Sequence, residues 1–119
     1  MAVVALTKEN FKNTVEQNNI VLVDFWATWC GPCRMFAPVY EKVSEKYPDI
    51  VFGKVDTEDA RDLASEYQIM SIPTLMIFKE NLLVFRQSGA LPEKALDDLV
   101  SKVKQLDMDT VRADMAKDQ

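Results

Sequence analysis

The spacing of apolar residues along the chain predicts an α/β protein. Ile20–Trp26 is apolar and β-branched or aromatic at nearly every position, which is typical of a strand covered on both faces of a sheet. Val3–Leu6 and Ile50–Asp56 are also predicted strands. Thr74–Lys79 and Leu82–Ser88 are separated by two residues, a spacing that indicates an antiparallel hairpin.

Helical periodicity fills the segments between these strands. Thr7 is placed to cap a helix from Lys8 to about Gln17. After Cys30, apolar residues repeat at helical spacing until Pro48. A short helix is predicted after the second long strand, and Pro92 opens a last strong helix with one apolar face. Strands that alternate with helices predict a mixed sheet with helices on its faces.

Length and composition predict one domain followed by a tail. The chain has 119 residues, of which 48% are hydrophobic, and this is enough for a single modest core. Residues 107–119 are polar apart from Met108, Val111 and Met115. Because such a segment has little apolar surface to bury, we expect a domain over residues 1–106 and a frayed or disordered tail over 107–119.

Charge and hydropathy exclude several classes of partner. Lys and Arg number 14 against 19 Asp and Glu, a net charge of -5, so we expect no nucleic-acid partner. The longest apolar run, Ile20–Ala27, contains Asp24 and is far shorter than the roughly 20 residues that cross a bilayer. Met1–Leu6 is too short for a secretion signal, and Lys8 and Glu9 interrupt it. We therefore expect a cytoplasmic protein without a membrane partner, and a monomer, since no apolar helix face exceeds what the core requires.

The two cysteines lie in the segment Trp29-Cys30-Gly31-Pro32-Cys33, between the buried strand and the start of a helix. A disulfide that closes so small a loop adds little stability, which favours a chemical role. The helix N-terminus favours the thiolate of Cys30, the predicted nucleophile. Cys33 lies one turn further into the helix and fits the resolving role. Pro32 fixes the loop, and Gly31 lets a partner's backbone approach.

A Cys-x-x-Cys pair could instead be half of a metal site. The chain has no histidine and no third cysteine, so four such ligands would require a second subunit. We expect no metal, and a cluster bridged between two chains is the alternative.

Asp24 is the only charged residue in the predicted central strand. Burial would raise the pKa of its carboxyl and make it a candidate proton acceptor for Cys33. The alternative is that this side chain reaches solvent at the end of the strand.

Three short segments, Val23–Ala27, Trp29–Cys33 and Ile72–Thr74, resemble the thioredoxin family. The resemblance runs from about Leu6 to Leu106. It implies the thioredoxin fold, with a central mixed five-stranded sheet flanked by four helices. It also implies an oxidoreductase that reduces protein disulfides by thiol–disulfide exchange, with a redox-active Cys30–Cys33 disulfide and no bound cofactor. Thioredoxin reductase would reduce the Cys30–Cys33 disulfide again after each cycle, so that NADPH is used indirectly.

The same resemblance assigns further site residues. It implies a cis peptide bond before Pro73, and it places Lys54 beside the buried Asp24. Substrate proteins that contain disulfides would dock on a flat apolar surface formed by Trp29, Gly31, Pro32, Ile72, Pro73, Gly89 and Ala90. Ser71 stands where many thioredoxins have glycine, a departure that bears on partner choice rather than on chemistry.

Two other functions fit the same fold. One is a disulfide oxidase or isomerase, although Gly31-Pro32 resembles the dipeptide of reductants. The other is a binding module in which the thiols are incidental. Replacement of both cysteines by serine separates the second alternative from a redox function, because binding would persist.

Overall fold

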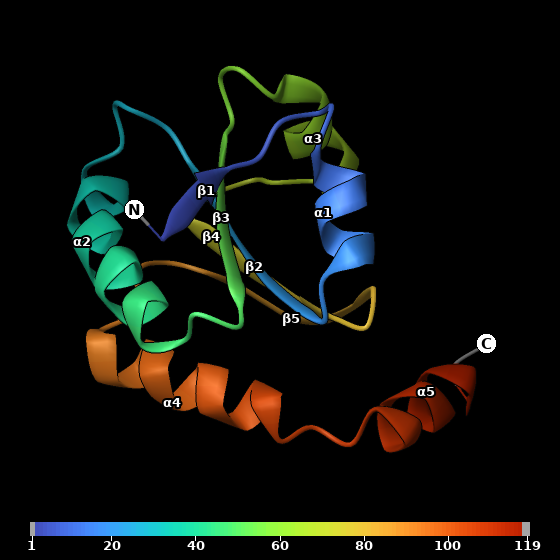
Figure 1. The fold of residues 1–119 in the computed structure, drawn as a ribbon. Coiled ribbons are helices and arrows are strands. Elements are labelled where there is room, and N and C mark those ends of the chain that lie inside the picture. The colour runs from blue at the N-terminus through green and yellow to red at the C-terminus, as the bar shows by residue number, and fades with distance from the viewer. Residues whose placement is uncertain (1, 118–119) are drawn as a thin grey trace.

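A five-stranded sheet with helices on both faces forms the centre of the computed structural model, which describes residues 2–117 (Figure 1). The strands are β1 (Val3–Ala5), β2 (Ile20–Trp26), β3 (Val51–Asp56), β4 (Thr74–Lys79) and β5 (Leu82–Ser88). The helices are α1 (Phe11–Gln17), α2 (Gly31–Lys46), α3 (Arg61–Glu66), α4 (Glu93–Lys104) and α5 (Met108–Lys117). The strand order is β1-β3-β2-β4-β5. The first three of these pair in parallel, and β4 is antiparallel to both β2 and β5, which confirms the predicted mixed sheet.

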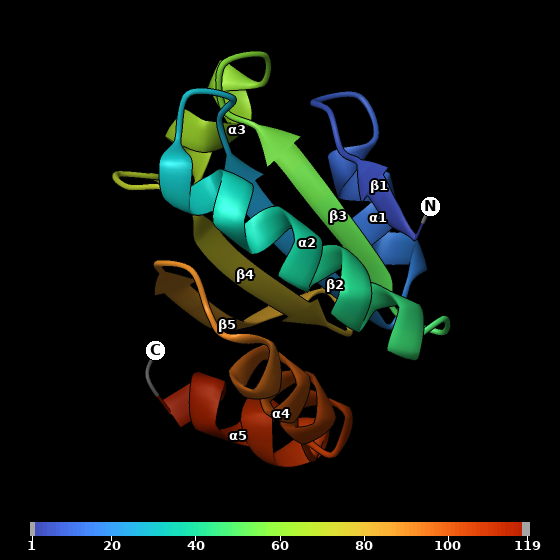
Figure 2. The same cartoon turned by 90° about the vertical axis from the view of Figure 1, so that its left-hand side faces the viewer.

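The side chains of β2 divide between two apolar layers. Leu22 packs in a cluster with residues of α2 and α4, among them Phe36. Val23, on the other face, packs in a cluster with residues of α1 and α3, among them Phe11. Figures 1 and 2 show the corresponding layers, with α2 and α4 on one side of the sheet and α1 and α3 on the other. The near-continuous apolar run of β2 is explained by this double coverage.

The first helix begins later than predicted. The backbone N–H groups of Asn10 and Phe11 donate to the carbonyl of Thr7, at 3.2 and 2.9 Å. The side chain of Asn10 accepts from the N–H of Thr7 at 2.7 Å. Thr7 thus starts a turn that precedes α1, instead of capping a helix from Lys8.

The structure has a fifth helix where a frayed tail was expected. Asp107 accepts hydrogen bonds from the N–H of Asp109 and the hydroxyl of Thr110, a capping arrangement that satisfies a free donor of α5. Met108 is buried, and Arg112 forms an ion pair with Glu80 in the β4–β5 turn. The expectations of four helices and of a disordered segment over 107–119 are therefore corrected for Met108–Lys117, while the division at residue 106 stays a prediction.

Lys79 links the sheet to the junction of α4 and α5. Its side chain is buried, and its Nζ donates to the carbonyls of Val103, Lys104 and Leu106 at 2.8, 3.1 and 3.0 Å. Carbonyls at a helix C-terminus lack partners within the helix and attract a positive charge. Lys79 therefore supplies the donor for the carbonyls of Lys104 and Leu106, and it adds a charged donor to the Val103 carbonyl, which also accepts from the N–H of Leu106 at 3.2 Å.

We predict that Lys79→Met lowers the free energy of unfolding by about 2 kcal/mol, because three partly buried carbonyls lose their charged donor. The matched control is Lys94→Met on α4, whose exposed side chain pairs with Asp98 one turn away. This substitution should change stability by less than about 0.5 kcal/mol. Urea unfolding followed by circular dichroism measures both. Equal midpoints for the two variants would contradict this role of Lys79.

Candidate active site

Cys30 and Cys33 lie where the central strand passes into the longest helix. Cys30 is the N-cap residue of α2, and its Sγ accepts a hydrogen bond from the N–H of Cys33 at 3.2 Å. The two residues form a disulfide, with their Cα atoms 5.2 Å apart. They expose only 4% and 3% of their surface. The disulfide therefore sits at a helix N-terminus whose free N–H groups and partial positive charge favour a thiolate once the bond is reduced.

The residues around the disulfide leave one side open. Trp29 is 66% exposed, and a side chain built onto Gly31 would meet nothing within 4 Å. Pro32, at the start of α2, is also exposed. The structure thus brings together beside Cys30 three residues that the resemblance assigned to a docking surface.

The loop before β4 closes another side of the disulfide. The Ile72–Pro73 peptide bond is cis, as the resemblance implies. The carbonyl oxygen of Ile72 lies 3.7 Å from the Sγ of Cys30, and the carbonyl of Pro73 accepts a hydrogen bond from the N–H of Gly89 at 2.8 Å. Gly89 has a φ of 102°, which glycine adopts readily. The exposed pair Gly89 and Ala90 is therefore tied to the loop that touches the disulfide.

Asp24 is buried inside the protein rather than reaching solvent. It exposes 4% of its surface, and among residues 2–117 its Oδ1 has no hydrogen-bond partner. Along β2 it follows Leu22 on the face that α2 covers. Burial raises the pKa of Asp24 to about 7, and the positive charge of Lys54 acts in the opposite direction. The carboxyl can therefore gain or lose a proton near neutral pH.

Lys54 lies directly across from Asp24 in the β2–β3 register. Its Nζ is 5.4 Å from the ring centroid of Trp26, a distance at which a cation is attracted to the ring face. Lys54 and Trp26 also line a hollow of about 420 Å³. Lys54 thus supplies a positive charge beside the buried carboxyl, at the place that the resemblance gave it.

Tyr40 belongs to this buried region but was not singled out from the sequence. Its hydroxyl donates to the carbonyl of Gly53 at 2.7 Å. Burial, and then the negative charge of Asp24, raises the pKa of Tyr40 well above its usual value. In the sequence Tyr40 is one of several apolar positions of a helix. It comes close to Asp24 only because α2 packs on the sheet, and sequence spacing does not show this contact.

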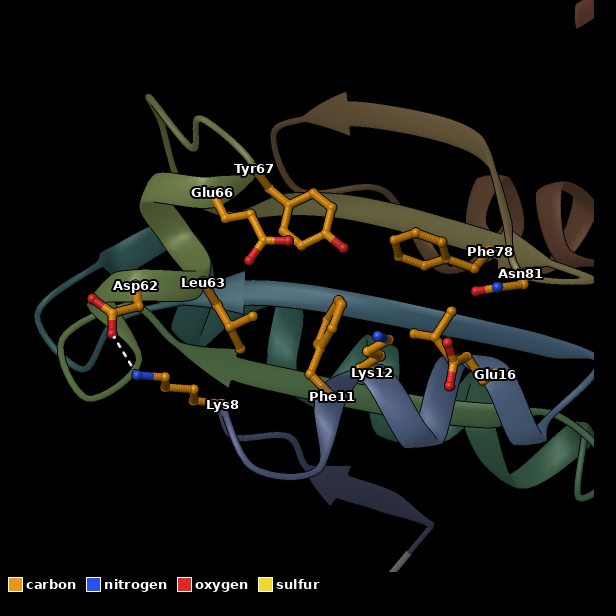
Figure 3. Close-up of a pocket in the computed structure, with 11 residues that line it drawn as sticks. Lys8, Phe11, Lys12, Glu16, Asp62, Leu63, Glu66, Tyr67, Phe78 and Asn81 are labelled. Carbon is orange, nitrogen blue, oxygen red and sulfur yellow. Dashed lines mark hydrogen bonds and ion pairs between the residues drawn. The ribbon is translucent and has the colours of Figure 1, made fainter.

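Two hollows differ in their relation to the disulfide. One of about 320 Å³ lies beside it and is lined by Trp29, Thr57, Ala64, Ile69, Met70, Ser71 and Ile72. A larger one of about 550 Å³ lies between α1 and α3, where the rings of Phe11, Tyr67 and Phe78 meet at tilted and edge-on angles (Figure 3). Trp29 and Ile72, which lie next to the disulfide, line the smaller hollow and not the larger one, so size does not identify the reactive site.

Two features of residues 2–117 bear on other kinds of function. In this part of the chain no three His, Cys, Asp or Glu side chains gather so that they could hold a metal ion. Within the same range no helix is long and apolar enough to cross a membrane.

The fold and the disulfide together define a protein-disulfide oxidoreductase. The family model described as Thioredoxin matches residues 2–105. A Streptomyces coelicolor protein with the provisional name thioredoxin 2 is 59% identical over 116 residues, covering 98% of this chain and 87% of the relative. The chain belongs to the thioredoxin family, whose members act by thiol–disulfide exchange with a redox-active cysteine pair.

Solved structures agree with this membership. A single-site mutant of a thioredoxin from Halobacterium salinarum is 34% identical, with a TM-score of 0.79, and the match covers 84% of this chain and 88% of that one. A structure from work on the thiol resolving mechanism of yeast mitochondrial 1-Cys peroxiredoxin via glutathione and thioredoxin systems is 33% identical. Its TM-score is 0.78, and the match covers 85% of this chain and 95% of that one.

The buried carboxyl should make stability fall with rising pH. Asp24 keeps its proton up to about pH 7 in the folded protein but loses it near 3.8 when unfolded, so unfolding is favoured increasingly as pH rises through that window. Asp24→Asn removes the ionisable carboxyl and with it this pH dependence. The free energy of unfolding of the variant should therefore exceed that of the wild type by a margin that grows with pH, to the order of 4 kcal/mol at pH 7 and above. Urea unfolding at a series of pH values checks this. A constant difference between the two proteins from about pH 4 to 8 would show that Asp24 titrates normally.

Proposed function

We propose that this protein reduces disulfides in other proteins with Cys30 as the nucleophile and Cys33 as the resolving thiol. The Cys30 thiolate attacks one sulfur of a substrate disulfide, and the other sulfur leaves as a thiolate. Cys33 then attacks the Sγ of Cys30, the mixed disulfide breaks, and the reduced substrate departs from the Cys30–Cys33 disulfide. The observation that carries this assignment is the position of Cys30 at the N-cap of α2, where the N–H of Cys33 donates to its sulfur.

We further propose that Asp24 accepts the proton that Cys33 must lose before it attacks. Within the described part of the chain one carboxyl oxygen of Asp24 has no hydrogen-bond partner, and the pKa of about 7 allows Asp24 to bind and release a proton at neutral pH. Lys54, opposite Asp24 in the register, is assigned a supporting role because its charge favours the ionised carboxylate. This pairing would keep the acceptor partly charged when the mixed disulfide forms.

The proposed docking surface surrounds the open side of the disulfide. It comprises Trp29, Gly31, Pro32, Ile72, Pro73, Gly89 and Ala90. The exposed indole of Trp29 and the free space over Gly31 support contact with an extended substrate segment. The Ile72 carbonyl, 3.7 Å from the Cys30 sulfur, would hold that segment next to the reacting atom.

Four further assignments complete the proposal. The oxidised protein would be reduced again by thioredoxin reductase, which draws on NADPH, so that no cofactor binds to this chain itself. Proteins with accessible disulfides would be the substrates, and the related peroxiredoxin study supports peroxiredoxins as one such class.

We assign the protein to the cytoplasm, because a dithiol reductant suits a compartment that keeps thiols reduced. We also assign a monomer, since the redox-active disulfide forms between two cysteines of the same chain.

The central test is reduction of insulin disulfides with dithiothreitol as the electron source. Cys30→Ser should lose turnover completely, because no thiolate remains to attack the substrate. Cys33→Ser that is reduced beforehand and freed of dithiothreitol should form a mixed disulfide with insulin that accumulates and is visible by non-reducing electrophoresis, because Cys33 is no longer there to resolve it. A Cys30→Ser protein that still turns over, or accumulation in that variant instead of in Cys33→Ser, would reverse the roles.

The test also separates the alternatives. A wild type no faster than dithiothreitol alone would favour the binding module. A disulfide oxidase would transfer its disulfide to a reduced peptide faster than it reduces insulin.

Asp24 should impose a pH dependence on the resolving step. In the wild type, the rate at which the mixed disulfide breaks down should rise through about pH 7, as the carboxylate becomes available. Asp24→Asn should lose this inflection and be about tenfold or more slower at neutral pH. Lys54→Met, which removes the opposing charge, should move the inflection to higher pH. Stopped-flow mixing with a fluorescent disulfide peptide measures the rates, and identical profiles for wild type and Asp24→Asn would exclude a proton-accepting role.

A further inference from the structure

The hollow of about 320 Å³ beside the disulfide extends the proposed docking surface toward α3. Ile72 lines this hollow and also packs against the cluster that contains both cysteines. Trp29 lines it as well. Because the carbonyl of Ile72 lies 3.7 Å from the Cys30 sulfur, a side chain close to the half-cystine of a bound substrate can enter this hollow. Most of the residues that line it are apolar, so an apolar side chain is the occupant that fits.

Met70 forms the most exposed wall of the hollow. Its side chain is 91% exposed, although it lies between Ile69 and Ser71, which line the same space. A thioether on an unbranched chain adapts to partners of different shape and packs well against aromatic rings. Met70 is therefore suited to cover apolar side chains of varied size.

We propose that Met70 is an adjustable wall that holds an apolar substrate side chain beside the attacked half-cystine, and that its oxidation by a peroxide weakens docking. This inference rests on the proposed function, since it assumes that protein disulfides are reduced at Cys30. It adds a specificity residue and a modification site that regulates the same surface.

The modification needs only a peroxide as the oxidant. The sulfur of Met70 attacks one peroxide oxygen, an S–O bond forms while the O–O bond breaks, and water leaves when the peroxide is hydrogen peroxide. The sulfur is oxidised by two electrons and the peroxide is reduced by two. Access decides which methionines react, so Met70 and the 75% exposed Met35 should be oxidised well before the buried Met76 and Met108.

A sulfoxide at this position opposes docking because it is polar. When a substrate covers the hollow, the sulfoxide oxygen loses its hydrogen bonds to water and lies against apolar side chains that cannot replace them. We expect KM for a protein disulfide to rise about five- to tenfold after oxidation. Hydroxyethyl disulfide carries no side chain that would fill the hollow, so its reduction should keep the same rate.

The experiment treats the disulfide form of the protein with hydrogen peroxide, so that the cysteines are already oxidised and are not thiol targets. Catalase then removes the peroxide, and peptide mass spectrometry follows each methionine. Insulin and hydroxyethyl disulfide are the two substrates, and every protein is compared with itself before and after treatment. Met70→Leu removes the sulfur from the hollow, and Met35→Leu is the matched control, because Met35 is exposed but does not line the hollow.

The expected result is a rise in KM for insulin in the wild type and in Met35→Leu, with none in Met70→Leu. Untreated Met70→Gln, which is polar without oxidation, should resemble the oxidised wild type. An unchanged KM in wild type that carries fully oxidised Met70 would overturn the inference, as would an equal loss in Met70→Leu. Failure of the untreated wild type to reduce insulin would instead contradict the proposed function, so the two failures are distinguishable.

Discussion

The parallel pairing of β2 with β3, together with the antiparallel pairing of β2 with β4, positions every reactive group described here. β2 is hydrogen-bonded on both edges and covered on both faces, so its position in the sheet is closely fixed. Its C-terminal end leads into the turn that presents Cys30 at the start of α2. Its neighbour β4 begins directly after Pro73, which brings the cis peptide bond to the same edge of the sheet. The disulfide thus lies between the turn that leads from β2 into α2 and the loop that precedes β4, and both are positioned by β2.

The buried carboxyl of Asp24 shows a conflict between stability and chemistry. A charged group without a full set of hydrogen bonds is unfavourable in an apolar layer, and the opposing charge comes from Lys54 on the neighbouring strand. An apolar residue at this position would pack without that cost. A carboxyl whose pKa lies near 7 is, however, the kind of group that can take a proton from a thiol and release it again in each cycle.

The sequence predicted the elements whose pattern is local. The bounds of β2, β4 and β5 were correct because each contains a run of apolar residues and turn residues separate it from the next element. The start of α1 was wrong because a backbone turn at Thr7 competes with capping. Helix α5 was missed because its stability depends on distant partners, Glu80 and the Lys79 side chain. From the sequence alone, Lys79 resembles any solvent-exposed charged residue at the end of a strand.

The cysteine motif was evident from spacing, whereas the hollow beside Met70 exists only after the loop before β4 packs against the disulfide.

Strand β4 separates two ends of the molecule. Thr74, at one end, follows the loop that touches the disulfide, and Lys79, at the other, holds the junction of α4 and α5. The five residue steps of extended chain between Thr74 and Lys79 place these ends roughly 17 Å apart. A solid support or a bulky label attached through α5 would therefore face away from the reactive sulfur. The Cys33→Ser protein fixed in this way would present an unobstructed surface for the capture of its disulfide partners from a mixture.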